Sequence, residues 1–222
     1  MNSLQTYTDK YDKGYGLCFA DGHIVRFYER ILKYKLGKTS GNLLDFGCGN
    51  GVHSAFLKTK GFVPYGLDIV PSVKESYEMM TGGGGACHII KPAASFKHLF
   101  ECKFDLIIAN QSLYYLGFDD FKRTINELFE LCNENAIIFA TMMSEENYYF
   151  RSALKPDKQG LQEVRLQGRL NETSFIRFIK EAKQLESEFY PFETLLLGDY
   201  DPINFYDFEG SAKHFIFVGV KK

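Results

Sequence analysis

The segment 43–52, with the sequence LLDFGCGNGV, carries glycines at positions 47, 49 and 51. Glycine adopts positive φ values at no steric cost, and a backbone without side chains lets a ligand approach its N–H groups closely. The apolar residues 43–46 indicate a buried strand, and residues 53–60 indicate a helix. A turn of this composition between a strand and a helix predicts a ligand-binding loop.

The residue types of this loop separate three classes of ligand. A phosphate-binding P-loop ends in Gly-Lys-Ser/Thr, but residues 50–52 are Asn, Gly and Val, with no cation. The dinucleotide fingerprint places its third glycine where this chain has Val52, which weakens a dinucleotide site without removing it. A positively charged ligand with a ribose but no phosphate suits an acidic, cation-free loop, and S-adenosylmethionine meets that description.

A second acid follows the next predicted strand. Residues 63–67 indicate a strand whose beginning is marked by Pro64, because proline cannot donate to a sheet ladder, and Asp68 follows its end. Rossmann-like folds place an acid there on the ribose hydroxyls, since a carboxylate accepts both diol protons. Such an acid alone is more often a helix cap or a turn residue, but together with the glycine loop it predicts ribose binding.

The segment LLDFGCGNG resembles motif I of the class I (Rossmann-like) S-adenosylmethionine-dependent methyltransferases, and FDLIIAN at 104–110 is similar to their motif IV. The resemblance implies a small-molecule methyltransferase that binds S-adenosylmethionine and releases S-adenosylhomocysteine, with no metal expected. It also implies a set of cofactor-binding residues spread along the chain. They are Asp45, Gly47, Cys48, Gly49, Asn50 and Gly51 in the loop, Asp68 and Ile69 after the second strand, Ala94 and Ser95 after the third, Asn110 and Gln111 after the fourth, and Tyr15 in an N-terminal lid.

Two segments distinguish this chain from members of the resembled family. An acid after the third strand usually binds the adenine amino group, but residues 91–95 are KPAAS, which leaves adenine to backbone groups, to Ser95 or to apolar contacts. Enzymes that methylate nucleic-acid bases carry Asn/Asp-Pro-Pro-Tyr/Phe after the fourth strand. Residues 110–113 are NQSL, and this disfavours that subclass.

Strand and helix patterns alternate along the chain. Helices are predicted at 23–34, 53–60, 71–81, 118–131 and 173–185, and strands at 43–46, 63–67, 86–90, 104–110, 136–142, 192–197 and 214–220. The last two strands have no helix between them, so they should pair as an antiparallel hairpin. We expect an α/β fold, a three-layer Rossmann-like sandwich with a mostly parallel seven-stranded sheet. A single domain over 1–222 would have a helical lid at 1–40 and a variable substrate cap at 144–190.

The sequence identifies no catalytic base. Methyl transfer from a sulfonium depends mostly on alignment, and a base is needed chiefly to deprotonate a hydroxyl acceptor. The catalytic candidates are Tyr114, Tyr115, Glu145 and His23. The candidates for substrate contact are Tyr115, Tyr149, Arg151, Arg165 and Arg169, whose arginines favour a sugar- or phosphate-bearing metabolite. The acids Asp199, Asp201 and Asp207 would instead suit an amine.

The composition limits the partners of the protein. A chain of 222 residues that is 45% hydrophobic can bury one substantial core, and a net charge of -2 gives no basic excess for nucleic acid or an anionic membrane surface. The five cysteines occur singly, and no apolar run is long enough to span a bilayer. We expect a cytoplasmic protein with a small-molecule substrate, without nucleic-acid or membrane partners, and the oligomeric state is left open.

The leading hypothesis is transfer of a methyl group from S-adenosylmethionine to an O or N atom of a small polar metabolite. One alternative is an NAD-dependent oxidoreductase that uses the same glycine turn and ribose acid. Another is a non-catalytic Rossmann-like binding subunit, suggested by the missing adenine acid and the missing base.

Overall fold

The computed structural model describes residue 8 and residues 18–167, 171–202 and 210–222. Its main sheet has seven strands in the order β3-β2-β1-β4-β5-β9-β8. They are β1 Gly41–Phe46, β2 Phe62–Asp68, β3 Cys87–Ile89, β4 Phe104–Ala109, β5 Cys132–Met143, β8 Glu193–Tyr200 and β9 His214–Val220. The predicted fold class, a mostly parallel seven-stranded Rossmann-like sheet, is confirmed.

The strand directions bring several loops to one edge of the sheet. β1 pairs in parallel with β2 and β4, and β4 pairs in parallel with β5, so the residues after these strands meet at their carboxyl ends. β9 runs antiparallel between β5 and β8. His214 at its beginning lies opposite both Met143 and Tyr200. The predicted antiparallel pairing of the last two strands is therefore confirmed, and it places His214 at the carboxyl edge.

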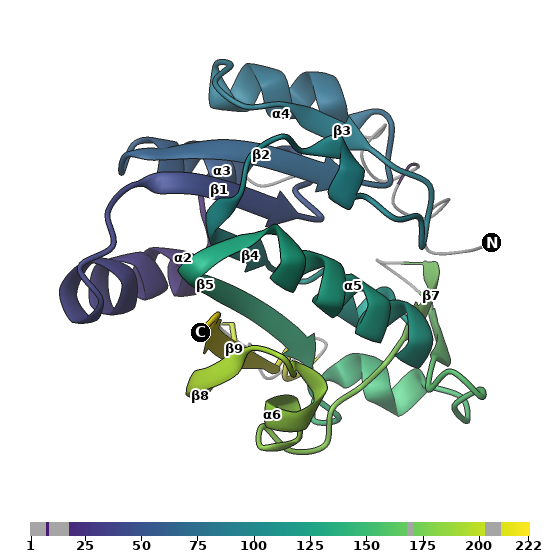
Figure 1. Ribbon diagram of the computed structural model, residues 1–222. Helices are drawn as coiled ribbons and strands as arrows, with labels where there is room; N and C mark the ends of the chain where they lie inside the picture. Colours follow the sequence, from purple (N-terminus) through teal and green to yellow (C-terminus); the bar gives the residue numbers. More distant parts are fainter. Residues whose placement is uncertain (1–7, 9–17, 168–170, 203–209) are drawn as a thin grey trace.

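Helices cover both faces of the sheet (Figure 1). They are α2 Gly22–Arg26, which continues as the π-helix η1 Phe27–Lys35, then α3 Val52–Lys58, α4 Val73–Thr81 and α5 Phe118–Leu131. On one face, Ile24 of α2 and Leu57 of α3 share a buried cluster with Leu43 of β1. On the other face, Ile125 of α5 packs in a cluster with Ile107 of β4. The sheet is thus the middle layer of three.

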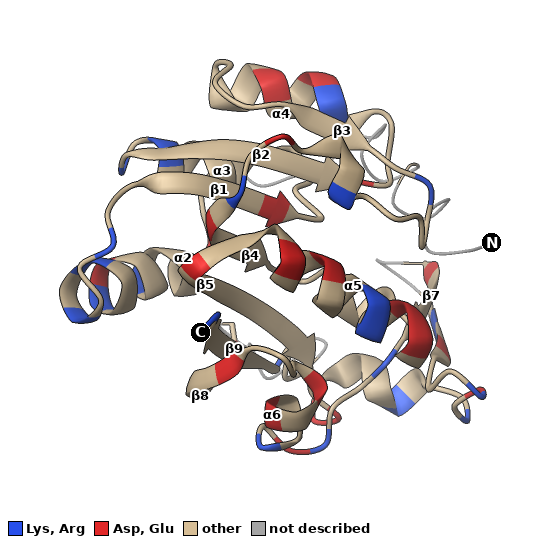
Figure 2. Ribbon diagram, viewed as in Figure 1, with Lys and Arg blue, Asp and Glu red and all other residues tan. Residues whose placement is uncertain are grey.

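Charged residues lie mostly on the helices and loops, whereas the ribbons of β1, β2 and β5 carry few of them (Figure 2). Near-continuous apolar strands are what a sheet covered on both faces requires. Among the helices that the structure describes, none is long and apolar enough to cross a membrane.

Pro64 lies inside β2 rather than at its beginning. β2 starts at Phe62, and Pro64 pairs with Leu43 of β1. The carbonyl oxygen of Pro64 faces Gly85, where an added Cβ would lie 1.4 Å from it. The ring nitrogen of Pro64 faces the same edge of β2 as its carbonyl oxygen, but β3 pairs only with residues 66–68 of β2. The missing N–H therefore removes no ladder bond, and the predicted position of the proline was wrong.

The helix predicted at 173–185 is also wrong. Residues Glu172–Ile176 form strand β7, which pairs antiparallel with β6 at Gln162–Leu166, and the helix α6 covers only Gln184–Glu188. Glu172, Ser174 and Ile176 are buried while the residues between them are half-buried, which is the period of two of a strand. The predicted cap region 144–190 therefore contains a β-hairpin.

Candidate functional site

The predicted ligand-binding loop connects β1 to α3 at the carboxyl edge of the sheet. Its glycines have left-handed φ values of 74° at Gly47, 50° at Gly49 and 81° at Gly51. The N–H of Gly47 donates to the carbonyl oxygen of Leu67 at 2.7 Å, which ties the loop to the end of β2. A Cβ on Gly47 would lie 2.5 Å from the Cβ of Ser112, so both the backbone conformation and the space require glycine.

Asp68 is the last residue of β2, and only 9% of it is exposed. Its Oδ2 accepts from the N–H of Gly49 at 2.9 Å, and its Oδ1 accepts from the N–H groups of Ile69 and Val70 at 2.7 and 2.9 Å. Burial raises the pKa of Asp68, and these three backbone donors offset part of the rise. The carboxylate holds the glycine loop against the end of β2, where the sequence predicts ribose binding.

Two other residues of motif I face the protein interior. Asp45 is 2% exposed, and its Oδ2 accepts from the Oγ of Ser54 at 2.8 Å. Burial raises the pKa of Asp45 and also raises that of Cys48, whose Sγ lies 3.9 Å from the Sγ of Cys87. Asn50, between the last two glycines, is half-buried. Asp45 therefore ties β1 to α3 across the loop, and Cys48 anchors the loop against Cys87 of β3.

Four side chains, from the start of α2, from α3 and from β5, converge on Asn110, the residue after β4. Its Oδ1 lies 2.9 Å from Nε2 of His23 and accepts from Oγ1 of Thr141 at 3.3 Å. Its Nδ2 donates to Oδ2 of Asp21 at 3.2 Å and lies 3.1 Å from Nε2 of His53. Because a carboxylate only accepts, the amide orientation is fixed and Nε2 of His23 is the donor to Oδ1. These five residues are the Asn110 cluster.

The charges of the Asn110 cluster follow from its burial and its pairing. Burial alone would raise the pKa of Asp21, but the hydrogen bond and the charge of His53, with smaller contributions from His23 and Asn110, leave the pKa lowered. Burial lowers the pKa of His23 against the opposing effects of Asn110 and Asp21. At neutral pH the site thus pairs an ionised carboxylate with a neutral imidazole at His23. Within the described ranges, no three His, Cys, Asp or Glu side chains are placed to hold a metal ion.

Three stacked rings extend the site towards the antiparallel end of the sheet. His23 stacks on Tyr200 with centroids 3.8 Å apart, and Tyr200 stacks on His214 with centroids 5.2 Å apart. His23, Tyr200 and His214 are the ring stack. Gln111 has a φ of 53°, and its Nε2 donates to the hydroxyl of Tyr200 at 2.9 Å. A left-handed residue other than glycine at a strand end is typical of a functional site.

The four catalytic candidates lie at different places along the same edge. His23 belongs to both the Asn110 cluster and the ring stack. The ring of Tyr114 is buried, with its centroid 5.6 Å from that of His214, and the ring of Tyr115 lies 4.5 Å from Tyr114. Glu145 is half-buried just after β5. The structure brings His23 and Tyr114 to the ring stack and gives no comparable contact for Glu145.

The predicted substrate residues of the cap that the structure describes lie in the segment 148–152 and on β6, which are neighbours through the bridge between Ala153 and Val164. Tyr149 donates its hydroxyl to Oε1 of Glu172 at 2.5 Å. Arg165 is exposed on β6 and forms an ion pair with Glu163 at 2.6 Å, and Arg151 is exposed in the 3-10 helix η4 Tyr148–Ser152. Arg169 and Tyr15 lie outside the described residues. Substrate contact by these side chains stays a prediction.

The residues predicted to contact adenine follow β2 and β3. Ile69 and Ala94 are half-buried, and Ser95 is exposed. Ser95 lines an open depression of about 470 Å³ together with Lys97 and with Arg123 of α5. This depression lies along α5 rather than at the edge where the glycine loop and Asp68 meet, so we do not assign it to the cofactor.

Five residues of the site were missed by sequence reasoning, namely Asp21, His53, Thr141, Tyr200 and His214. His53 had a usable signal, because it lies two residues after the last loop glycine in the first turn of α3. Asp21 immediately precedes α2, whereas Thr141, Tyr200 and His214 lie on strands far from the glycine loop in the chain. The proximity of these three depends on strand register, which no local pattern reveals.

The parallel sheet, the glycine loop and the acid at the end of β2 define a Rossmann-like ligand-binding protein. Residues 19–185 match the model of the family described as "Methyltransferase domain". The chain therefore belongs to this methyltransferase family, and it is an S-adenosylmethionine-dependent methyltransferase. This assignment sets aside the oxidoreductase and the non-catalytic alternatives.

Solved structures share the fold at low sequence identity. A methyltransferase from Methanosarcina mazei is 20% identical, with a TM-score of 0.64, over 83% of this chain and 93% of that one. The 1,6-didemethyltoxoflavin-N1-methyltransferase of Burkholderia thailandensis, with its substrate and S-adenosylhomocysteine bound, is 15% identical, with a TM-score of 0.65, over 99% and 87%. An S-adenosylmethionine-dependent methyltransferase from Clostridium acetobutylicum is 15% identical, with a TM-score of 0.64, over 98% and 97%. Among curated protein sequences, none matches the chain significantly.

Proposed function

We propose that this methyltransferase methylates an O or N atom of a small polar metabolite held at the carboxyl ends of β4 and β5. The observation that carries the proposal is the convergence of Asp21, His23 and His53 on Asn110, at the same sheet edge as the glycine loop. The Burkholderia thailandensis enzyme, which has the same fold, holds a small molecule together with S-adenosylhomocysteine. Its example supports an acceptor of similar size here.

In this proposal the glycine loop and Asp68 hold the cofactor. The left-handed backbone at residues 47–51 lets the methionine portion approach the loop closely, and Asp68 accepts from the ribose hydroxyls. Asp45 positions the loop through its bond to Ser54. Ile69 and Ala94 offer apolar contact to the adenine. The protein's main contribution to the transfer is to align the acceptor with the sulfonium methyl and to exclude water.

His23 is our candidate for the group that receives the acceptor's proton. Its Nε2–H is committed to Asn110, which leaves the lone pair on Nδ1. Burial lowers the pKa of His23, so the imidazole is neutral and able to accept at neutral pH. The ionised Asp21, 4.0 Å from Nε2, stabilises the imidazolium once the proton has moved.

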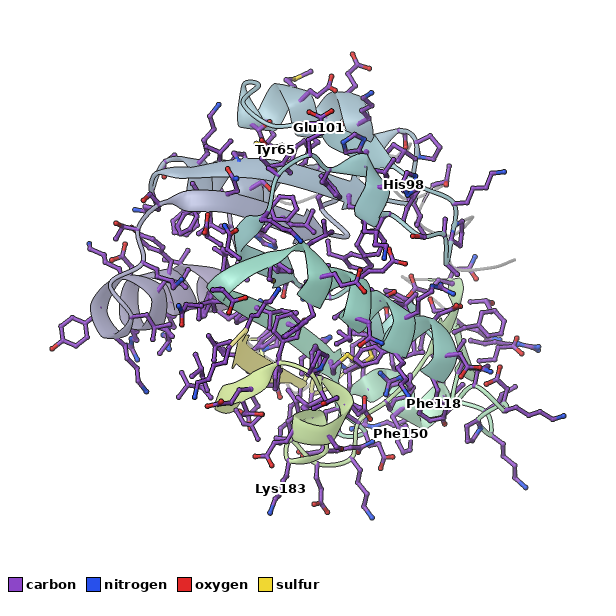
Figure 3. The ribbon with its side chains drawn as sticks, in the orientation of Figure 1. Tyr65, His98, Glu101, Phe118, Phe150 and Lys183 are labelled. Carbon is purple, nitrogen blue, oxygen red and sulfur yellow. The ribbon has the colours of Figure 1, made fainter. Side chains whose placement is uncertain are left out.

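Calorimetry with S-adenosylhomocysteine and a screen of metabolites with methyl-labelled S-adenosylmethionine test the proposal. Once an acceptor has been identified, His23→Gln should lower kcat by a factor of about 10²–10⁴ while the affinity for S-adenosylhomocysteine is retained. The matched control is His98→Gln, because His98 is exposed on η2 Lys97–Leu99, away from α2 (Figure 3). Failure of S-adenosylhomocysteine to bind would refute the cofactor site, and equal activity of the two variants would refute the role of His23.

A further inference from the structure

His214 has a ring nitrogen that the described part of the protein leaves without a partner. The residue is 5% exposed, and its Nδ1 lies 2.8 Å from the carbonyl oxygen of Ala212. A carbonyl only accepts, so Nδ1 carries the hydrogen and Nε2 carries the lone pair. This Nε2 is buried and makes no hydrogen bond among the described residues. Buried polar atoms are nearly always paired, so a free acceptor at a site edge marks a position for the donor group of a ligand or for an ordered water.

The neighbouring rings prevent His214 from turning to find another partner. Tyr200 lies parallel to it, at an interplanar angle of 6°, and the buried Tyr114 lies against it at 44°. The hydroxyl of Tyr200 accepts a hydrogen bond from Nε2 of Gln111, and the Tyr200 ring also stacks on His23. The lone pair of Nε2 is therefore held in a fixed direction, beside the residues that we assign to methyl transfer.

The electrostatics of this position favour a donor and disfavour an anion. Burial lowers the pKa of His214 to about 4, and His23 acts in the same direction, while Asp201 and Asp21 oppose it. At neutral pH His214 is thus an uncharged acceptor. Asp21 is ionised, since its pKa is lowered. A phosphate or carboxylate would face a lone pair and a negative charge, whereas an N–H group carrying positive charge would be attracted by both.

We infer that the methyl acceptor is a basic nitrogen compound, an amine or a protonated N-heterocycle, which donates an N–H to Nε2 of His214 with Asp21 as its counter-charge. The inference rests on the proposed function and narrows its substrate class. It departs from the sugar- or phosphate-bearing acceptor that the cap arginines suggested.

The transfer that follows is balanced in protons and electrons. One N–H proton of the bound cation passes to Nδ1 of His23, which frees the nitrogen lone pair. That pair forms the bond to the methyl carbon, and the C–S electron pair returns to sulfur to give neutral S-adenosylhomocysteine. The methylated nitrogen takes up the positive charge that the sulfonium loses, and His23 releases its proton to solvent.

The test compares two panels of acceptors with labelled S-adenosylmethionine. One panel holds primary amines and aminobenzimidazoles, and the other holds sugar phosphates and hydroxybenzoates. His214→Phe keeps an aromatic ring at this position and removes both ring nitrogens, while Asp21→Asn keeps the shape and removes the charge. The controls are His98→Phe, at an exposed position, and Asp120→Asn, at a half-buried position where Asp120 forms an ion pair with Arg123. Calorimetry with S-adenosylhomocysteine runs alongside every variant, so that a folding or cofactor defect is recognised.

We expect transfer to members of the amine panel, with KM raised roughly 10-fold in His214→Phe, the equivalent of one lost hydrogen bond. Asp21→Asn should raise KM for the charged amines more than for neutral ones. Binding of S-adenosylhomocysteine without any transfer to the amine panel would overturn the inference. So would transfer confined to the phosphates and carboxylates, or an unchanged KM in His214→Phe. Absence of S-adenosylhomocysteine binding to the wild type would instead overturn the proposed function.

Discussion

Replacement of Gly47 by alanine should destabilise the protein through two separable effects. The φ of 74° costs an L-residue about 1–2 kcal/mol. The new Cβ would also lie 2.5 Å from the Cβ of Ser112, and such overpacking adds about 1–3 kcal/mol. We expect the free energy of unfolding to fall by about 2–5 kcal/mol. Gly82 has a φ of 60° with nothing within 4 Å of an added Cβ, so Gly82→Ala should show the backbone effect alone.

Urea unfolding followed by circular dichroism measures both variants, and a double-mutant cycle isolates the collision. Ser112→Gly removes the obstructing Cβ and the hydrogen bond from its Oγ to the carbonyl oxygen of Phe46, at 2.8 Å. The double variant Gly47→Ala/Ser112→Gly should therefore be more stable than the sum of the single losses predicts, by about 1–3 kcal/mol. Strict additivity, or a loss in Gly47→Ala no larger than in Gly82→Ala, would refute the steric reasoning.

Three further predictions concern buried polar groups. Burial lowers the pKa of His214 from 6.5 to about 4, so between these pH values the unfolded chain binds a proton that the folded chain does not. The stability present above pH 6.5 should therefore fall by about 3 kcal/mol as the pH is lowered to 4. In urea unfolding, His214→Phe should lose less stability over this range. Glu127→Leu leaves the N–H groups of Phe96 and Lys97 without their acceptor and should cost about 1–3 kcal/mol, measured as a lower urea midpoint. Glu188→Ala breaks the ion pair with the buried Arg177 and should cost about 3–5 kcal/mol of stability in thermal unfolding. Replacing both Arg177 and Glu188 by apolar residues should cost less, and equal losses would refute the account.

The part of the site formed by motif I and the end of β2 could be predicted because its chemistry is local. Glycine spacing at 47, 49 and 51 fixes a loop between a strand and a helix, and an acid at the end of the next strand follows from the alternation of strands and helices. The order of the parallel strands then places Asp68 beside the loop, with Oδ2 accepting from Gly49.

The ring stack could not be predicted, because its residues meet through strand register rather than through spacing. Tyr200 and His214 lie opposite each other because of the register in which β8 and β9 pair, and His23 reaches Tyr200 from α2. The helix predicted at 173–185 failed for a related reason. Four of its residues, 173–176, belong to β7, whose strand structure depends on pairing with β6.

The position of β9 between β5 and β8 sets an order in which the site can be completed during synthesis. The chain is synthesised from its N-terminus, so the N-terminal strands are available for pairing first. The glycine loop, Asp68 and β4 can assemble early, because β1, β2 and β4 pair among themselves. Among the described strands, β8 lies at the edge of the sheet and pairs with β9, so this pairing must wait for residues 214–220 to emerge. A nascent chain would thus have the glycine loop in place before it has His214, and the ring stack would be completed last.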